Sequence, residues 1–185
     1  MRHIAAILLY VCAIGPAAGQ PAQVIIIRHA EKPDDGNELN QRGRERAAAL
    51  VAYFQGRPEV LQFKTSAAIY AQAPKNSGSS IRPLQTVKPL AAALKLQVVQ
   101  RFMHDDYRDM VKEILKREDL KDRMVLICWE HKVIPDIAQA LGATDAPGKW
   151  HGDVFDRTWV ITFGRNSDVA LSNLPQTLLF GDSAK

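Results

Sequence analysis

Hydrophobic positions along the chain follow two patterns that alternate. Short runs rich in β-branched residues are typical of buried strands, and they occur at residues 23–28, 67–71, 97–100 and 124–129. Between these runs, apolar residues recur every three or four positions, which is the period of a helix with one buried face. This second pattern predicts helices at residues 40–55, 80–94, 107–117 and 133–141.

Polar residues mark the expected beginnings of two helices and the position of a hairpin. Asn40 can cap the first helix, and Ser79 or Ser80 can cap the second, because these side chains accept hydrogen bonds from the first turn. Residues 158–163 and 169–171 alternate in the strand period around a polar, glycine-containing segment. That arrangement predicts an antiparallel hairpin near the end of the chain.

The order of the expected elements predicts an α/β fold. Strand and helix alternate four times before the hairpin, which indicates a three-layer α/β/α sandwich with a mainly parallel sheet and a C-terminal antiparallel hairpin. The sequence contains no repeat and no second hydrophobic unit, so residues 20–185 are expected to form one domain. In such sheets, ligands bind beyond the carboxyl ends of the strands.

The beginning of the chain, residues 1–19, is predicted to be an export signal. An arginine near the start precedes an apolar run of eleven residues, 4–14, and small residues before Gln20 suit cleavage. Eleven residues cannot cross a hydrocarbon core, which needs about 20. We therefore expect a periplasmic or secreted protein that begins near Gln20 and has no stable membrane anchor after signal cleavage.

Composition narrows the choice of partners. The chain has 185 residues, of which 46% are hydrophobic, and a formal charge of +4. It contains no run of five basic residues, which argues against a nucleic-acid partner, whereas the positive excess favours an anionic ligand. Cys12 and Cys128 are too few for a disulfide framework or a cysteine zinc site.

Charged residues gather after the four expected parallel strands. They are Arg28 and His29 after the first strand, Arg82 after the second, His104, Asp105 and Asp106 after the third, and Glu130 and His131 after the fourth. Arginine forks match the geometry of phosphate and stay charged, and a helix start adds backbone N–H donors. Histidine can attack phosphorus or donate to phosphoryl oxygens. This combination predicts phosphoryl transfer without a metal ion.

Four segments carry a further pattern, in order along the chain. They are Arg28-His29-Ala30, Leu39-Asn40-Gln41-Arg42-Gly43, Arg82-Pro83-Leu84-Gln85-Thr86, and the strand that ends before His131. They resemble the Arg-His-Gly/Ala signature, the Leu-Thr-x-x-Gly helix start, the Arg-x-x-Gln-Thr motif and the second histidine of the histidine phosphatase superfamily, whose fold is also called phosphoglycerate mutase-like. The resemblance covers residues 23–165.

The resemblance implies a role for each matched residue. His29 would be the nucleophile that becomes phosphohistidine, and Arg28, Arg82 and His131 would bind the phosphoryl oxygens. The family implies a small phosphorylated substrate and needs no cofactor and no metal ion. Fixed cations around those oxygens would stabilise the charge of the transition state.

The chain departs from the family pattern around the second histidine and at the general acid. Glu130 precedes His131 and can orient it and favour its protonated form, while Lys132 follows it and either binds a substrate anion or is solvated. The usual glutamate acid has no obvious counterpart. Asp105 or Asp106 is therefore expected to protonate the leaving group, with Asp105 slightly preferred, and capping of the next helix is their alternative role.

Other polar residues on these elements are expected to be structural. Arg42, Arg44 and Arg46 indicate a solvated helix face. His104 beside two aspartates does not indicate a metal site, because three adjacent residues cannot all face one ion.

The function expected from the sequence is that of an exported phosphatase acting on phosphate monoesters. A phosphomutase is the first alternative, but the short connection between Arg82 and Asp105 leaves little room for a lid over the substrate. A catalytically silent protein that binds a phosphorylated ligand is the second alternative. A protein-phosphohistidine phosphatase is the third.

Overall fold

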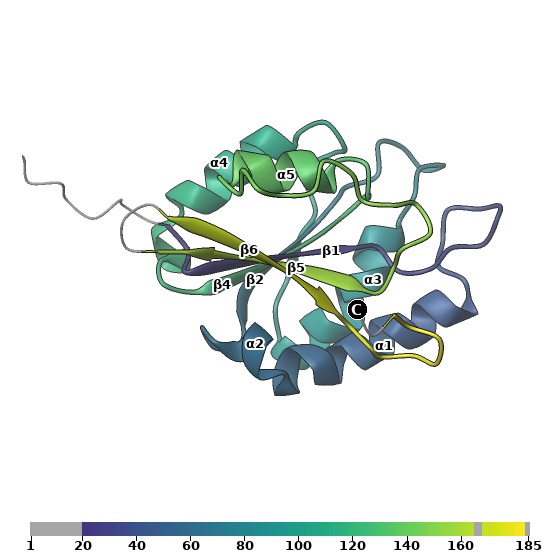
Figure 1. The fold of residues 1–185 in the computed structure, drawn as a ribbon. Helices are drawn as coiled ribbons and strands as arrows, with labels where there is room; N and C mark the ends of the chain where they lie inside the picture. The colour runs from purple at the N-terminus through teal and green to yellow at the C-terminus, as the bar shows by residue number, and fades with distance from the viewer. Residues whose placement is uncertain (1–19, 165–167, 184–185) are drawn as a thin grey trace, which may run out of the picture.

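The computed structural model describes residues 20–164 and 168–183, and six strands of this part of the chain form one mixed sheet (Figure 1). The strands are β1 (Gln23–Arg28), β2 (Ser66–Ala71), β3 (Val98–Val99), β4 (Met124–Trp129), β5 (Arg157–Phe163) and β6 (Val169–Pro175). Their order is β3-β2-β4-β1-β5-β6, with the first four parallel and with β5 and β6 antiparallel to their neighbours. The predicted sheet and hairpin are confirmed, whereas the expected export signal, residues 1–19, lies outside the described residues.

Helices cover both faces of the sheet, as the layers in Figure 1 show. They are α1 (Gln41–Gly56), α2 (Pro58–Leu61), α3 (Arg82–Leu94), α4 (Tyr107–Lys116) and α5 (Ile134–Ala140), with a short 3-10 helix, η1 (Glu118–Leu120). On β1, Val24 and Ile26 pack toward α4 and α5, while Ile25 and Ile27 pack toward α1 and α3. All four side chains are fully buried, and burying such a side chain stabilises the fold by about 1.5–3 kcal/mol.

Some predicted boundaries are right and two are wrong. Asn40 caps α1 as expected, and its side-chain oxygen accepts from the backbone N–H of Gly43 at 2.8 Å. The third strand is only two residues long rather than 97–100, because it pairs with β2 alone at the edge of the sheet. Ile81, rather than Ser79 or Ser80, occupies the N-cap position of α3, although Ser80 Oγ accepts from the N–H of Arg82 at 3.4 Å.

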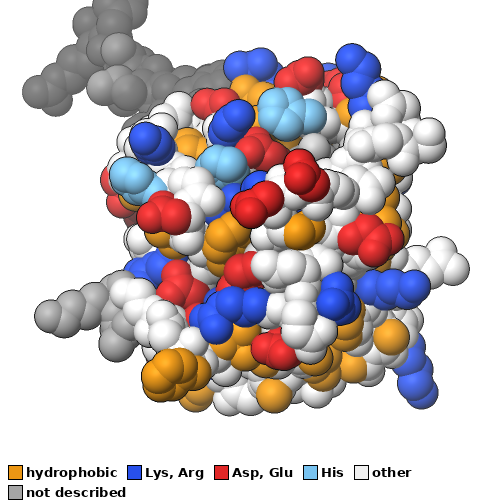
Figure 2. Space-filling model, turned by 90° about the vertical axis from the view of Figure 1, so that its right-hand side faces the viewer, with side chains coloured by type: hydrophobic (Ala, Val, Ile, Leu, Met, Phe, Trp, Pro, Cys, Tyr) orange, Lys and Arg blue, Asp and Glu red, His pale blue; other side chains and the backbone are white. Residues whose placement is uncertain are grey.

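The carboxyl ends of the parallel strands meet at one edge of the sheet, at the right of Figure 1. Figure 2 looks onto that edge, where histidine, arginine or lysine, and acidic side chains lie among one another. This is the edge at which the sequence places the site. None of the helices in the described ranges is both long and apolar enough to span a membrane.

Candidate active site

His29 lies directly after β1 at the carboxyl edge of the sheet. Its backbone N–H donates to the carbonyl of Trp129 at 3.1 Å, which extends the pairing of β1 with β4 by one residue. The residue is only 4% exposed. The ring Nδ1 lies 2.8 Å from the carbonyl oxygen of Ala30. Because a carbonyl can only accept, Nδ1 donates and the lone pair of the neutral ring is on Nε2.

The surroundings of His29 keep its ring neutral. Burial lowers its pKa from 6.5 to about 4, although the hydrogen bond to Ala30 acts in the opposite direction. The positive charges of Arg28, Arg82 and His131 lower the pKa further. These three side chains are therefore near enough to act on the ring of His29, and we call the four residues together the His29 pocket. A neutral imidazole with a lone pair on Nε2 is a nucleophile at neutral pH.

Arg28 is a buried cation that forms no ion pair with a carboxylate among residues 20–164 and 168–183. It is 2% exposed, and its Nη1 donates to the carbonyls of Gly152 at 2.6 Å and Val154 at 3.0 Å. Its guanidinium carbon lies 3.8 Å from the centre of the Phe155 ring, a cation–π arrangement. Burial lowers its pKa to about 10, against the attraction of Glu130, and the buried Nε has no hydrogen-bond partner among the described residues. An anion would complete these contacts.

Arg82 opens α3, and the same helix fixes the backbone beyond His29. Arg82 donates through Nε to the carbonyl of Glu38 at 3.0 Å and through Nη2 to that of Gly36. Burial lowers its pKa. One turn further on, Thr86 accepts from the N–H of Ala30 at 2.9 Å and donates to the carbonyl of Arg82 at 2.8 Å. The spacing of arginine and threonine therefore ties α3 to the first strand end.

Glu130 and His131 follow β4. His131 Nδ1 lies 2.8 Å from Glu130 Oε1, in an ion-pair contact that lacks the alignment of a hydrogen bond. Glu130 is itself held, since its N–H donates to Gln72 Oε1 at 3.1 Å and its Oε2 accepts from the N–H of Lys132 at 3.0 Å. Burial and Arg28 lower the pKa of His131, whereas Glu130 raises it. Glu130 thus acts in the expected direction but does not outweigh burial.

Lys132 is exposed, and its positive charge also lowers the pKa of His131. The ammonium group is therefore near enough to the His29 pocket to act on one of its members. Binding of a substrate anion by Lys132 stays a prediction.

The two candidate acids lie apart from the His29 pocket. The Asp105 side chain is 95% exposed, and its Oδ1 lies 2.6 Å from His104 Nδ1. Asp106 occupies the N-cap position of α4 without a side-chain cap bond, and its Oδ2 accepts instead from the N–H of Met103 at 2.9 Å. The alternative prediction of a helix-capping side chain is therefore wrong, and the role of Asp105 as acid stays a prediction.

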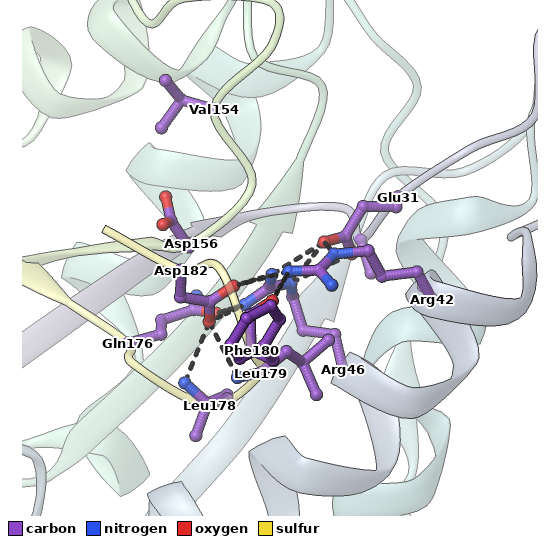
Figure 3. Close-up of polar contacts among 12 residues, drawn as sticks. Glu31, Arg42, Arg46, Val154, Asp156, Gln176, Leu178, Leu179, Phe180 and Asp182 are labelled. Atoms are coloured by element: carbon purple, nitrogen blue, oxygen red, sulfur yellow. Dashed lines mark hydrogen bonds and ion pairs between the residues drawn. The ribbon is translucent and has the colours of Figure 1, made fainter. Parts of the chain in front are cut away.

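Arg42 and Arg44 are exposed, as expected of a solvated helix face, whereas Arg46 contradicts that expectation. Arg46 is only 2% exposed. Its guanidinium donates to both oxygens of Glu31, at 2.7 to 3.1 Å, and to both oxygens of Asp182, at 2.7 and 2.9 Å. Figure 3 shows Arg46 between these two carboxylates. The apolar stripe of α1 includes this position, so a charged partner from elsewhere has to compensate it.

The C-terminal turn completes this second cluster. Arg46 Nη1 donates to Gln176 Oε1 at 3.1 Å, and Asp182 accepts from the N–H groups of Leu178 and Leu179. Arg42, one turn before Arg46 in α1, also donates hydrogen bonds to Glu31 and Asp182. We call Glu31, Arg42, Arg46, Gln176 and Asp182 the Arg46 cluster. Sequence reasoning missed it, although Glu31 is only two residues from His29.

A cavity of about 260 Å³ lies next to Glu130, because Gln72 in its wall accepts from the N–H of that residue. The polar residues of its wall are Gln72, Lys75, Ser79, Ser80, His104, Asp105 and Asp106. Within residues 20–164 and 168–183, no group of three or more His, Cys, Asp or Glu side chains is arranged to hold a metal ion. The donor set at this edge, with arginines and histidines, suits an oxyanion rather than a cation.

Comparison with solved structures identifies the fold. The chain superposes on the protein histidine phosphatase SixA, described in complex with tungstate, with a TM-score of 0.54 and 14% identity over 83% of this chain and 97% of that one. A SixA protein from Agrobacterium tumefaciens, named as a putative phosphohistidine phosphatase, gives a TM-score of 0.51 and 16% identity over 83% and 98% of the two chains. Phosphoglycerate mutase from Plasmodium falciparum gives a TM-score of 0.49, with 13% identity over 88% and 96%.

The two SixA neighbours show that the chain shares their α/β fold, in agreement with the fold predicted from the sequence. No protein-family model matches the sequence, and no curated protein matches it. At such low identity the likeness establishes the fold, and the activity has to be argued from the residues of the site.

Proposed function

We propose that the protein is a phosphatase that hydrolyses phosphate monoesters through a phosphohistidine intermediate on His29. The observation that carries the proposal is the neutral ring of His29, with its lone pair on Nε2, close to the guanidinium groups of Arg28 and Arg82 and to the imidazole of His131. A nucleophile surrounded by fixed cations suits attack on a phosphoryl group, whose oxygens gain charge in the transition state.

The reaction divides into two displacements at phosphorus. Nε2 of His29 attacks the phosphoryl group, the bond from phosphorus to the ester oxygen breaks, and the alcohol leaves with one proton. A water molecule then attacks the phosphohistidine, the N–P bond breaks with its electron pair returning to Nε2, and inorganic phosphate leaves. The hydrogen bond from Nδ1 to Ala30 holds the ring in the attacking tautomer throughout.

The neighbours support an oxyanion pocket at this edge. One SixA structure is a complex with tungstate, an oxyanion that can take the place of phosphate. In the present chain, the unpartnered Nε of Arg28 and the N-terminal turn of α3 beside Arg82 are donors suited to such an anion. We extend this inference to hydrolysis without a metal ion or cofactor.

A protein phosphohistidine is the second candidate substrate. The segments that border the site, residues 72–81 and 100–106, are short, and the adjacent cavity opens toward solvent. A phosphorylated side chain on another protein could enter such a site without the movement of a lid. Both SixA neighbours are named for this activity.

Export is also part of the proposal, and it rests on residues 1–19 alone. The apolar run and the small residues before Gln20 suit signal cleavage. We place the mature enzyme in the periplasm or outside the cell, with a small phosphorylated partner and no nucleic acid. Mass spectrometry of the exported protein should find a start close to Gln20, and an intact Met1 would contradict export by cleavage.

The decisive experiment is a rapid quench with a labelled phosphate ester in the presence of EDTA. The proposal expects label on His29 that is stable in base and lost in acid, and turnover that vanadate inhibits. A phosphomutase would instead return the label to a second hydroxyl of the substrate. A silent binding protein would retain phosphate binding without any labelled histidine. Loss of activity in EDTA that added metal restores would contradict the metal-free mechanism.

A further inference from the structure

His104 stands between two carboxylates at the edge of the site. Its Nδ1 lies 2.6 Å from Asp105 Oδ1, and its Nε2 lies 3.5 Å from Glu130 Oε2. On its other oxygen, Glu130 contacts His131 at 2.8 Å. The four side chains form a continuous line from the exposed Asp105 to a member of the His29 pocket.

The contacts at the two ring nitrogens of His104 differ in length, and so in whether the nitrogen can also contact a ligand. A carboxylate can only accept, so the ring donates to both neighbours only as an imidazolium. The Nδ1 contact has the length of a charge-assisted hydrogen bond, whereas 3.5 Å exceeds the usual donor–acceptor distance. In the imidazolium form, a proton on Nε2 would point toward Glu130 without a full hydrogen bond. The side chain is 44% exposed, so a ligand can reach it.

His104 lines the cavity, and two other residues of its wall contact neighbours of the His29 pocket. Gln72, in its wall, accepts from the N–H of Glu130, and Ser80, also in its wall, precedes Arg82 by two residues and accepts from its N–H at 3.4 Å. The cavity thus adjoins the residues that would hold the phosphoryl group. The alcohol part of an ester bound there extends into the cavity, and His104 is the imidazole in its wall.

The charges that face His104 come from three segments. Asp105 and Asp106 belong to its own loop, Glu130 follows β4, and Lys75 lies across the cavity after β2. Three carboxylates face one ammonium group, and His131 lies behind Glu130. Carboxylates therefore flank both nitrogens of the ring, while Arg28 and Lys132 lie on the far side of Glu130, near His131.

We propose that His104 is the general acid and base of the reaction, braced by Asp105 and Glu130, and that Asp105 positions His104 rather than protonating the substrate itself. This inference rests on the proposed function and names the group that the first displacement needs. As the ester bond breaks, the proton on Nε2 passes to the leaving oxygen and the alcohol departs. In the second displacement, Nε2 takes a proton from the attacking water, and the imidazolium is restored as inorganic phosphate leaves.

Leaving-group dependence tests this proposal. The rate of phosphohistidine formation is measured by rapid quench for n-propyl phosphate, whose alkoxide needs a proton, and for p-nitrophenyl phosphate, whose phenolate does not. His104→Ala should slow the step roughly 10²–10³-fold with the alkyl ester and less than about threefold with the nitrophenyl ester. Asp105→Asn should slow only the alkyl ester, and by less. His151→Ala, which removes another exposed histidine, is the matched control and should change neither rate.

The pH profile gives a second readout. With the alkyl ester, the wild-type pH profile should contain a limb that is absent from His104→Ala. Equal slowing of both esters, or an unchanged rate with the alkyl ester, would overturn the role of His104 while His29 still becomes labelled. A wild-type enzyme that forms no labelled histidine from either ester would instead overturn the proposed function.

Discussion

Two arginines of this protein are equally buried and differ in almost everything else. Arg28 and Arg46 are each 2% exposed. Burial lowers the pKa of Arg28 to about 10, because its nearest partners are carbonyl oxygens and an aromatic ring. Burial acts on Arg46 in the same direction, but hydrogen bonds to Asp182 and Glu31 raise its pKa above the ordinary value. The charge of Arg28 is therefore not balanced by an ion pair in the described ranges, whereas the charge of Arg46 is balanced by Glu31 and Asp182.

The difference shows how one short segment serves two purposes. Residues 28–31 carry Arg28 and the proposed nucleophile, His29, at one end and Glu31 at the other. The His29 pocket holds cations that an anionic ligand would balance, while the Arg46 cluster already balances its charges and joins the segment to α1 and to the C-terminal turn. Substitutions in the first region should therefore change turnover, and substitutions in the second should change stability. Four experiments can break or sharpen this division.

The largest effect is expected from His29→Ala. Removing the nucleophile should reduce turnover by about 10⁴-fold or more, because no other group can form the phosphohistidine. The midpoint of thermal unfolding should stay within a few degrees of the wild type, since the polar ring adds little apolar contact. Steady-state kinetics and circular dichroism check the two parts. Turnover at the wild-type rate would exclude His29 as nucleophile and would remove the contrast between the regions.

The opposite pattern is expected from Arg46→Met. This change leaves Glu31 and Asp182 in place without their main cation, and breaking a buried ion pair in this way costs about 3–5 kcal/mol. The free energy of unfolding, measured with urea, should fall by that amount. Turnover per folded molecule should change much less.

The matched control is Arg101→Met. Arg101 pairs with Glu113, but its side chain is 60% exposed, and such pairs contribute about 0–1 kcal/mol. An Arg46→Met protein no less stable than this control would show that the Arg46 cluster does not hold the fold together.

The sheet and its site edge were predictable because both follow from local patterns. The run of Val24 to Ile27 is apolar at every position, which is typical of a strand covered on both faces, and the structure buries all of it. Once the sheet is parallel, the residues after β1 and β4 share one edge, so the placement of His29 near His131 follows from topology. The proximity of these side chains therefore follows from the order and direction of the strands.

The Arg46 cluster was not predictable in the same way. Two of its central members, Arg46 and Asp182, lie 136 residues apart in the sequence, and no local sequence pattern pairs them. A partial signal was present, since Arg46 lies between Gly43 and Leu50 on the buried stripe of α1. The helical period therefore places this arginine inside the protein, but its partners become visible only when the C-terminal turn is folded. The missing caps at Ser79 and Ser80 have a similar origin, because loop hydrogen bonds engage Ser79 elsewhere.

A third experiment divides the His29 pocket itself. Arg82→Ala should reduce kcat by about 10²–10³-fold, the usual effect of losing one donor to a developing oxyanion. The stability should change little, because Arg82 donates only to the carbonyls of a loop and is part of no ion pair in the described ranges. The measurement is kcat with KM alongside unfolding in urea. A loss in KM alone would mean that Arg82 binds the substrate and its transition state equally.

The smallest and last effect is a difference in the pH dependence of stability between the two regions. The pKa of His29 is lowered to about 4 in the folded protein. Between about pH 4 and pH 6.5, His29 is therefore protonated in the unfolded chain and neutral in the folded protein. This contribution is fully present above pH 6.5 and is lost as the pH falls toward 4, to the extent of up to about 3 kcal/mol.

Asp182 acts in a lower window. Its hydrogen bond with Arg46 and those with the N–H groups of Leu178 and Leu179 outweigh burial and lower its pKa from 3.8 to about 2. Its contribution to stability is therefore present above pH 3.8 and is lost as the pH falls toward 2. Urea unfolding across pH 2 to 7 should show that His29→Ala flattens only the upper window and Asp182→Asn only the lower one. If Asp182→Asn instead altered the stability between pH 4 and 6.5, the Asp182 carboxylate would be influencing the titration of the His29 pocket. The two regions would then be electrostatically coupled rather than independent.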